Sequence, residues 1–114
     1  MKDKDHLYIL WTNGDPVTAD KMVFMYALNS LKKGWWSEVT VIVWGAPAKL
    51  IADNEGVRTG VTKLMAGGVH VTACKACADQ LGVTGTLEGI GIEVIYWGEP
   101  LTAVIKSEYP LLTV

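Results

Sequence analysis

The sequence lacks long apolar runs, an excess of basic residues and the common nucleotide-binding motifs, and each absence excludes a class of protein. Its apolar stretches fall well short of the roughly 20 residues that a membrane-spanning helix needs. The segment MKDKDHLYILW has too short an apolar run for a signal peptide, and no small-residue cleavage site follows it. We therefore expect a soluble, cytoplasmic chain whose two cysteines are free thiols rather than a structural disulfide.

The charge of the chain gives no sign of a polyanionic partner. There are 10 lysine and arginine residues against 12 acidic ones, a net charge of −2, and the basic residues are scattered. This distribution argues against nucleic-acid binding, and the absence of a basic amphipathic helix argues against an anionic membrane surface. No GxGxxG follows the first predicted strand, and neither a P-loop nor a GxSxG motif occurs.

The sequence does contain enough apolar material for one domain. Half of the 114 residues are hydrophobic, so a single domain over residues 1–114 can form a core without disulfides. The mean hydropathy is positive, at +0.25. Because a chain this small leaves much of its surface outside the core, we expect other copies in a homo-oligomer to cover part of the apolar surface.

Apolar segments alternate with helical patterns along the whole chain. Strands are expected where β-branched and aromatic residues gather, at residues 7–11, 39–44, 69–73, 92–97 and 110–114. Helices are expected at residues 17–34, 48–54, 57–66, 75–81 and 101–109. The glycine-rich stretch TGTLEGIG, residues 84–91, is expected to be a flexible connection. This alternation predicts a single three-layer α/β/α domain, with a parallel sheet covered by helices on both faces.

The first predicted helix is unusually apolar. Asp15 is its expected N-cap, and Pro16 its first helical residue. Residues 22–28 are all apolar and make almost two helical turns, so one sheet face cannot cover them all. Such a helix is either deeply buried or located at a subunit interface, and we expect the interface.

Binding sites in such sheets gather at the carboxyl ends of the strands. The predicted substrate-binding residues follow four of these ends, and they are Asn13, Asp15, Gly45, Lys75 and Trp97. The predicted catalytic residues, Cys74 and Cys77, lie at the end of the third strand.

Cys74 and Cys77 stand in the segment VHVTACKACADQLGV. Cys74 is expected where a strand ends and a helix begins, and both the helix N-terminus and the neighbouring Lys75 favour a thiolate there. Residues three apart on a helix have Cβ atoms about 5–6 Å apart, which makes a dithiol/disulfide pair feasible. The alternative is that both cysteines are small core residues.

Metal binding and histidine-assisted catalysis are disfavoured, and no cofactor is indicated. His70 precedes Cys74 by four residues on an extended strand, a separation of roughly 13 Å, so it cannot share a metal ion with that thiol. His6 comes before its strand, at the opposite end of the sheet. A cysteine hydrolase would therefore lack its usual base.

Taken in order, these segments resemble the DsrE/DsrF-like family, which includes YchN-like proteins and sulfur-relay subunits. LWTNGDP is a strand ending in a polar turn before a long apolar helix, and VIVWGAP is a strand ending in Gly45. GVHVTACKACADQLGV supplies a strand, a cysteine and a short helix, and LEGIGIEV with a short last strand completes the pattern. The resemblance covers nearly the whole chain.

The resemblance implies a three-layer fold with a five-stranded parallel sheet and assembly into dimers, trimers or hexamers. In sulfur-relay members the cysteine after the third strand receives sulfur as a persulfide and passes it on, and Cys74 matches that cysteine. Cys77 looks like the second cysteine of some YchN-like members. Sulfur donor and acceptor proteins are the implied partners. Three functions remain open: sulfur relay through Cys74, a dithiol redox pair, and an oligomeric ligand-binding protein with an inert cysteine.

Overall fold

In the computed structural model, which describes residues 5–114, the strands form one five-stranded sheet in which all neighbours are parallel. Residues 1–4 of the predicted domain lie outside the described part of the chain. The strands are β1 (His6–Trp11), β2 (Glu38–Val43), β3 (His70–Cys74), β4 (Glu93–Ile95) and β5 (Leu111–Thr113). Their spatial order is β4-β3-β2-β1-β5. The five-stranded parallel sheet predicted from the sequence is confirmed.

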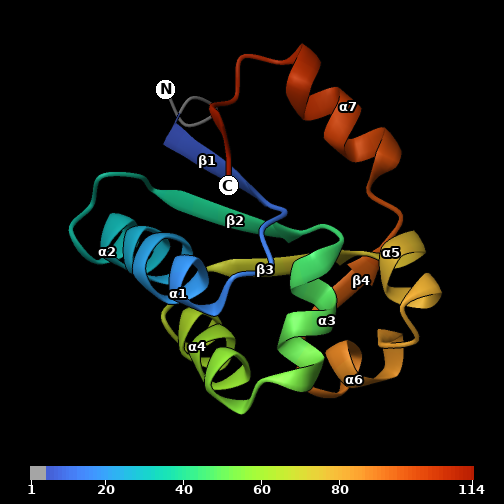
Figure 1. Ribbon diagram of the computed structural model, residues 1–114. Coiled ribbons are helices and arrows are strands. Elements are labelled where there is room, and N and C mark those ends of the chain that lie inside the picture. Colours follow the sequence, from blue (N-terminus) through green and yellow to red (C-terminus); the bar gives the residue numbers. More distant parts are fainter. Residues whose placement is uncertain (1–4) are drawn as a thin grey trace.

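Helices fill the connections between the strands (Figure 1). They are α1 (Pro16–Thr18), η2 (Ala19–Phe24), α2 (Met25–Lys32), α3 (Ala46–Asp53), α4 (Glu55–Ala66), α5 (Lys75–Gln80), α6 (Thr84–Gly89) and α7 (Gly98–Lys106). Within residues 5–114, none of these helices is long and apolar enough to cross a membrane.

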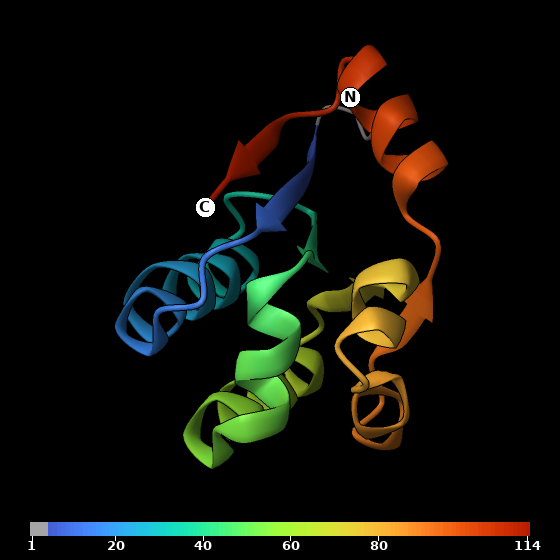
Figure 2. The same ribbon diagram turned by 45° about the vertical axis from the view of Figure 1, so that its right-hand side comes forward.

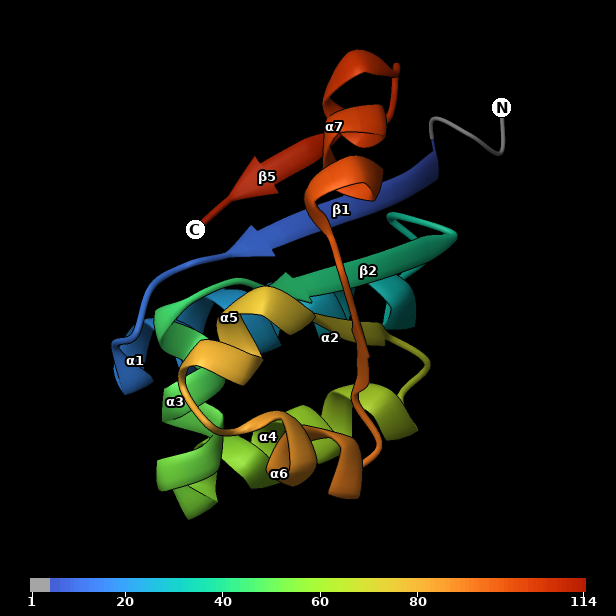
Figure 3. The ribbon, with the colours of Figure 1, turned by 90° about the vertical axis from the view of Figure 1, so that its right-hand side faces the viewer.

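The two faces of the sheet are covered unequally, because the chain reverses direction once. The steps from β1 to β2, β3 and β4 all proceed toward the same edge, and the last step returns past these strands to β5. Parallel crossovers are right-handed, so a step in the reverse direction places its helix on the opposite face of the sheet. Helix α7 makes this return, and it stands apart from the other helices in three views (Figures 1, 2 and 3).

The first face of the sheet carries the main hydrophobic core. Alternate side chains of β1 point into it, and Leu7, Ile9 and Trp11 are buried there. The ring of Trp11 meets the ring of Phe24 edge to face, with 5.5 Å between centroids. Strand β2 is buried at every position after its first residue, as expected for a central strand covered on both faces.

The second face carries a smaller apolar cluster beside α7. Its buried centre is formed by Ile42, Cys74 and Trp97, and Leu101 of α7 packs against them. The indole N–H of Trp97 donates to Thr72 Oγ1 at 2.8 Å, a buried hydrogen bond that fixes the orientation of the ring. The predicted reactive cysteine therefore lies on the face that α7 covers.

A chain of hydrogen bonds crosses the same face at the amino ends of four strands. His70 Nε2 lies 3.1 Å from a carboxylate oxygen of Glu93, and His70 Nδ1 lies 3.3 Å from the hydroxyl of Thr40. Thr40 Oγ1 is also 2.7 Å from His6 Nε2. A carboxylate only accepts, so His70 donates a hydrogen bond from Nε2 to Glu93. With His70 Nδ1 as an acceptor, Thr40 donates to His70 and His6 donates to Thr40. Burial lowers the pKa of His6 below its ordinary value of 6.5, in keeping with a neutral ring.

Two segments differ from the sequence-based expectation. The stretch expected to be a flexible connection contains helix α6, because Leu87 is fully buried in the main core and anchors that turn of chain. The fourth strand is limited to Glu93–Ile95, since Trp97 already has a helical backbone conformation as the N-cap of α7. Trp97 is consequently the residue before a helix rather than the last residue of a strand.

The first helix is continuous but changes type along its length. Residues 19–24 are π-helical between two α-helical parts, and Asp15 caps the start by accepting from Thr18 N at 2.8 Å. Met22 and Met25 are exposed, whereas Val23 is buried in the core. An apolar outer face thus remains on this helix, and its role as a subunit interface stays a prediction.

Thr40→Val removes the hydroxyl that joins His6 to His70 while keeping the branched shape of the side chain. We expect it to lower the free energy of unfolding by about 1 kcal/mol, because two ring nitrogens lose their partner in a partly buried place. Thr62→Val is the matched control, since its exposed hydroxyl bonds only to Arg58 O of its own helix. Equal urea-unfolding midpoints for the two variants would contradict a structural role for the chain of hydrogen bonds.

Candidate functional site

The candidate site is built where β3 ends and α5 begins, as the sequence predicted. Cys74 is the last residue of β3, pairs with Ile95 of β4, and occupies the N-cap position of α5 with an extended backbone. Its side chain is only 4% exposed and packs against Ile42 and Trp97. Cys74 thus has apolar neighbours on the sheet side and also lines a cavity.

Cys77 is the more accessible of the two free thiols. Burial and a hydrogen bond to the sulfur of Cys74 raise the pKa of the Cys77 thiol above its ordinary value of 9.0. The backbone N–H groups of Gly45 and of Cys77 itself donate hydrogen bonds to the Cys77 sulfur, and these bonds lower its pKa. The outcome is a thiol that stays protonated at neutral pH and donates a hydrogen bond to the sulfur of Cys74.

Gly45 connects β2 to α3 in a conformation that favours glycine. Its φ of +83° and ψ of −124° lie in a region that residues with a Cβ rarely adopt. This turn points the Gly45 N–H at the sulfur of Cys77. Gly45 therefore belongs to the site through its backbone, a role that its place after a strand indicated but could not specify.

A cavity of about 680 Å³ opens beside the thiols, and we call it the aromatic cavity. It lies between the start of α5 and the start of α7. The residues that line it are Trp44, Cys74, Ala76, Cys77, Gln80, Tyr96, Trp97, Gly98, Glu99, Pro100 and Ala103. Its volume is that of a site for a small organic molecule.

A second cavity of about 590 Å³ lies between α3 and α5. Its lining residues are Gly14, Gly45, Ala46, Lys49, Leu50, Asp53, Cys77, Gln80 and Leu81. Cys77 and Gln80 line both cavities, whereas Cys74 lines only the aromatic one. The Cys77 thiol can thus be approached from two sides.

Lys75 is held by its own helix. Its ammonium lies 3.2 Å from a carboxylate oxygen of Asp79 and 5.8 Å from the centre of the Tyr96 ring. Hydrogen bonds from Thr84 and Lys75 lower the pKa of Asp79, so this carboxylate is charged and compensates the ammonium. The expected effect of Lys75 on Cys74 is correspondingly reduced.

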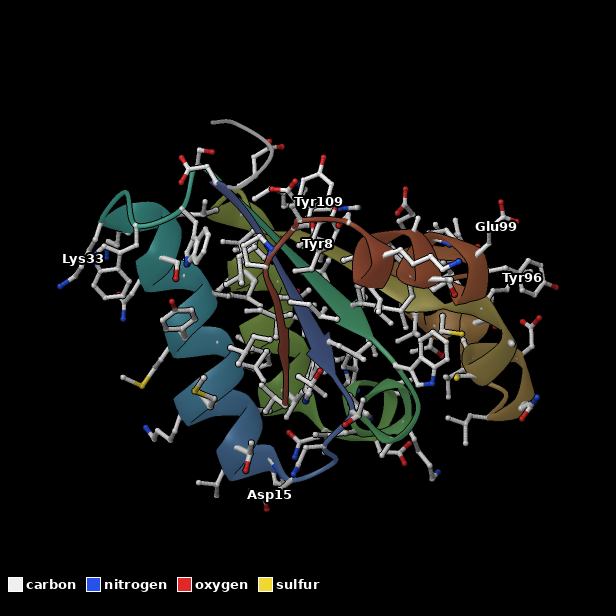
Figure 4. All side chains as sticks on the ribbon, turned by 90° about the horizontal axis from the view of Figure 1, so that it is seen from above. Tyr8, Asp15, Lys33, Tyr96, Glu99 and Tyr109 are labelled. Atoms are coloured by element: carbon white, nitrogen blue, oxygen red, sulfur yellow. The ribbon has the colours of Figure 1, made fainter. Side chains whose placement is uncertain are left out.

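Asn13 and Asp15 organise the turn after β1. The side chain of Asn13 accepts from Asp15 N at 2.8 Å, and Asp15 caps the first helix. Neither residue lines the two cavities described above, although Gly14 between them lines the second. Figure 4 shows Asp15 well away from Tyr96 and Glu99. Of the predicted substrate-binding residues, the structure brings Gly45 and Trp97 to the thiols.

Trp44, Tyr96, Glu99 and Gln80 line the aromatic cavity but were not among the predicted site residues. The first three follow strand ends, the same signal that identified Gly45. Gln80 is three residues after Cys77 and so shares its helix face. The positions of the first three after strand ends could indicate the region of the site. Which side chains line the aromatic cavity depends in addition on how α7 packs against the sheet.

The two histidines lie away from the thiols. His6 and His70 are the first residues of their strands, whereas Cys74 is the last residue of β3. Among residues 5–114 there is no group of three or more His, Cys, Asp or Glu side chains placed to hold a metal ion.

The chain is similar over all or nearly all of its length to two solved structures. The conserved protein of unknown function BT1422 from Bacteroides thetaiotaomicron is 38% identical, with a TM-score of 0.97, and the match covers 100% of this chain and 98% of that one. The ychN protein from E. coli is 15% identical, with a TM-score of 0.67 and coverage of 96% and 99%. At that identity the likeness shows the fold alone. No family model and no curated protein matches the chain.

Gly45→Ala tests the backbone conformation at the site. A Cβ at Gly45 or at Gly85 would meet nothing within 4 Å, but only Gly45 has a positive φ. We expect Gly45→Ala to lower the free energy of unfolding by about 1–3 kcal/mol. Gly85→Ala, in α6, should be neutral or stabilising by up to about 1 kcal/mol. Denaturant unfolding checks both, and equal effects would rule out a special role for the Gly45 turn.

Proposed function

We propose that this chain, which belongs to the same protein family as BT1422 of Bacteroides thetaiotaomicron, relays sulfane sulfur as a persulfide on Cys74. That relative is described as a protein of unknown function, so the proposal rests on the site and on the YchN-like fold. One observation carries it: Cys74 faces a cavity at the carboxyl edge of the sheet, and a second thiol is hydrogen-bonded to it.

The proposed transfer begins at Cys74. Its thiolate attacks the terminal sulfur of a donor persulfide, a Cys74–sulfur bond forms, and the donor leaves as a thiolate. An acceptor thiolate then attacks the same terminal sulfur and releases Cys74 unchanged. No net oxidation occurs, because the sulfane sulfur keeps its oxidation state throughout. A base is not needed as long as Cys74 is deprotonated when the donor arrives.

Cys77 decides how long the persulfide survives. A thiolate at Cys77 would attack the inner sulfur of the persulfide, form the Cys74–Cys77 disulfide and expel hydrosulfide. In the unloaded protein, burial and a hydrogen bond to the Cys74 sulfur raise the pKa of Cys77. Burial, the larger cause, would still favour the thiol, a poor nucleophile, after Cys74 is loaded. The structural feature that places Cys77 close to Cys74 thus also restrains its reaction.

The setting of this reaction is part of the proposal. A reducing, cytoplasmic compartment would keep both thiols free. The donor and acceptor would be other sulfur-carrying proteins or small persulfides. The exposed methionines Met22 and Met25 on the first helix would join copies of the chain into a homo-oligomer.

A dithiol redox function is the second candidate, and the contact between the two sulfurs favours it. Oxidation would join Cys74 to Cys77, while a partner disulfide takes up the two electrons and is reduced to thiols. Such a protein would cycle between thiol and disulfide without carrying sulfur. Sulfur relay adds a sulfur atom to the protein, whereas dithiol redox chemistry adds none.

Intact mass after exposure to a small persulfide separates the candidates. We expect the reduced protein to gain one sulfur atom, Cys77→Ser to keep this gain, and Cys74→Ser to lose it. Loss of hydrogen without added sulfur would instead identify a redox pair. An unchanged mass with every donor would leave only a protein with inert cysteines and contradict the proposal.

The lifetime of the Cys74 persulfide should depend on pH through Cys77. Below the raised pKa of Cys77, each unit of pH increases its thiolate fraction about tenfold, so hydrosulfide release should accelerate by about tenfold per unit. Above that pKa the rate should level off. The dependence should vanish in Cys77→Ser. Hydrosulfide release measured from preloaded protein checks this, and an equally steep profile in the Ser variant would exclude Cys77 as the resolving thiol.

A further inference from the structure

We propose that the aromatic cavity selects positively charged organosulfur compounds, such as a thiol, disulfide or persulfide that also carries an ammonium group. This inference rests on the proposed function, because it names the substrate class for the same thiol pair. Three aromatic side chains line the cavity, Trp44, Tyr96 and Trp97. The faces of such rings attract cations, and cages of aromatic rings recognise quaternary ammonium groups.

The charge of the residues that line the cavity also favours a cationic ligand. Among the described residues that line the cavity, Glu99 is the charged one. It lies in the first turn of α7, where the free N–H groups of the helix favour a carboxylate. Figure 4 shows Glu99 at the same end of the molecule as Tyr96. A ligand entering here meets one negative charge and several aromatic rings.

The positive charge of the neighbouring Lys75 does not cancel the negative charge at the cavity. The ammonium of Lys75 is paired with Asp79, whose carboxylate compensates its charge. The same ammonium lies 5.8 Å from the centre of the Tyr96 ring, so the protein already places a cation against this wall. An anionic ligand would approach both Glu99 and a Cys74 thiolate, and would be repelled by each.

The aromatic wall is also rigid on the side of the thiols. Trp97 is 6% exposed, and its N–H is held by Thr72 Oγ1 at 2.8 Å. The ring therefore keeps its place beside Cys74 when a ligand enters, which reduces the entropic cost of binding. Tyr96 is 64% exposed and forms the outer part of the wall, where it can be replaced without disturbing the core.

Three disulfides of different charge test the inference. They are thiocholine disulfide, which is cationic, 2-hydroxyethyl disulfide, which is neutral, and 3,3′-dithiodipropionate, which is anionic. A protein thiolate attacks one sulfur, forms a mixed disulfide and releases one thiolate, and the second cysteine then displaces the other as the internal disulfide forms. Each rate is followed by intact mass at low ionic strength and divided by the rate of the same disulfide with N-acetylcysteinamide.

After this correction we expect the cationic disulfide to react about fivefold faster than the neutral one, and the anionic one more slowly than either. Glu99→Gln and Tyr96→Leu should each reduce the cationic preference. Glu55→Gln is the control, because Glu55 also lies in the first turn of a helix, α4, and lines a different pocket. It should leave the preference unchanged.

The results separate the two proposals. Corrected rates that are equal for all three disulfides, or fastest for the anion, would overturn the charge selectivity and leave the sulfur-transfer function standing. A cationic preference that survives in both Glu99→Gln and Tyr96→Leu would overturn it as well, because the preference would arise elsewhere. Failure of every disulfide to react would remove the reactive thiol itself, and with it both proposals.

Discussion

The hydrogen bond from the Cys77 thiol to the Cys74 sulfur is the interaction on which the site depends. It joins two residues three positions apart at the start of a short helix, so it forms only if β3 ends at Cys74 and α5 begins at once. The N–H of Gly45, which follows the neighbouring strand β2, donates a hydrogen bond to the sulfur of Cys77. The adjacent ends of two parallel strands thereby fix the position of one thiol relative to the other.

The reversal of the chain after β4 provides the space around this pair. Since three crossovers run one way, their helices share one face of the sheet, and the second face is left to α7. Helix α7 starts directly after Trp97 and brings Glu99 and Pro100 over the cysteine side of the sheet. Topology therefore determines that Cys74 borders a cavity although its sulfur is nearly buried.

Much of the fold could be predicted because it is encoded locally. The apolar, β-branched run of β2 and the Asp15–Pro16 cap specify a central strand and a helix start without reference to the rest of the chain. The prediction of a flexible connection before β4 is wrong, since the helix there depends on the burial of Leu87 by residues distant in sequence. The place of the cysteines was predictable from the strand end. Two features of the site could not be predicted from the sequence. They are the contact of the Gly45 N–H with Cys77 and the cavity wall formed by Tyr96 and Glu99, and both depend on how connections far apart in the sequence pack together.

The central claim is that Cys77 is held as a thiol by burial and by Cys74. Its most direct test is the alkylation of Cys77 by iodoacetamide as a function of pH, followed by peptide mass spectrometry on the reduced protein. The account predicts a midpoint above the ordinary value of 9.0 in the native chain, and a lower midpoint in Cys74→Ala. A midpoint at or below 9.0 in the native chain, unmoved by Cys74→Ala, would contradict it.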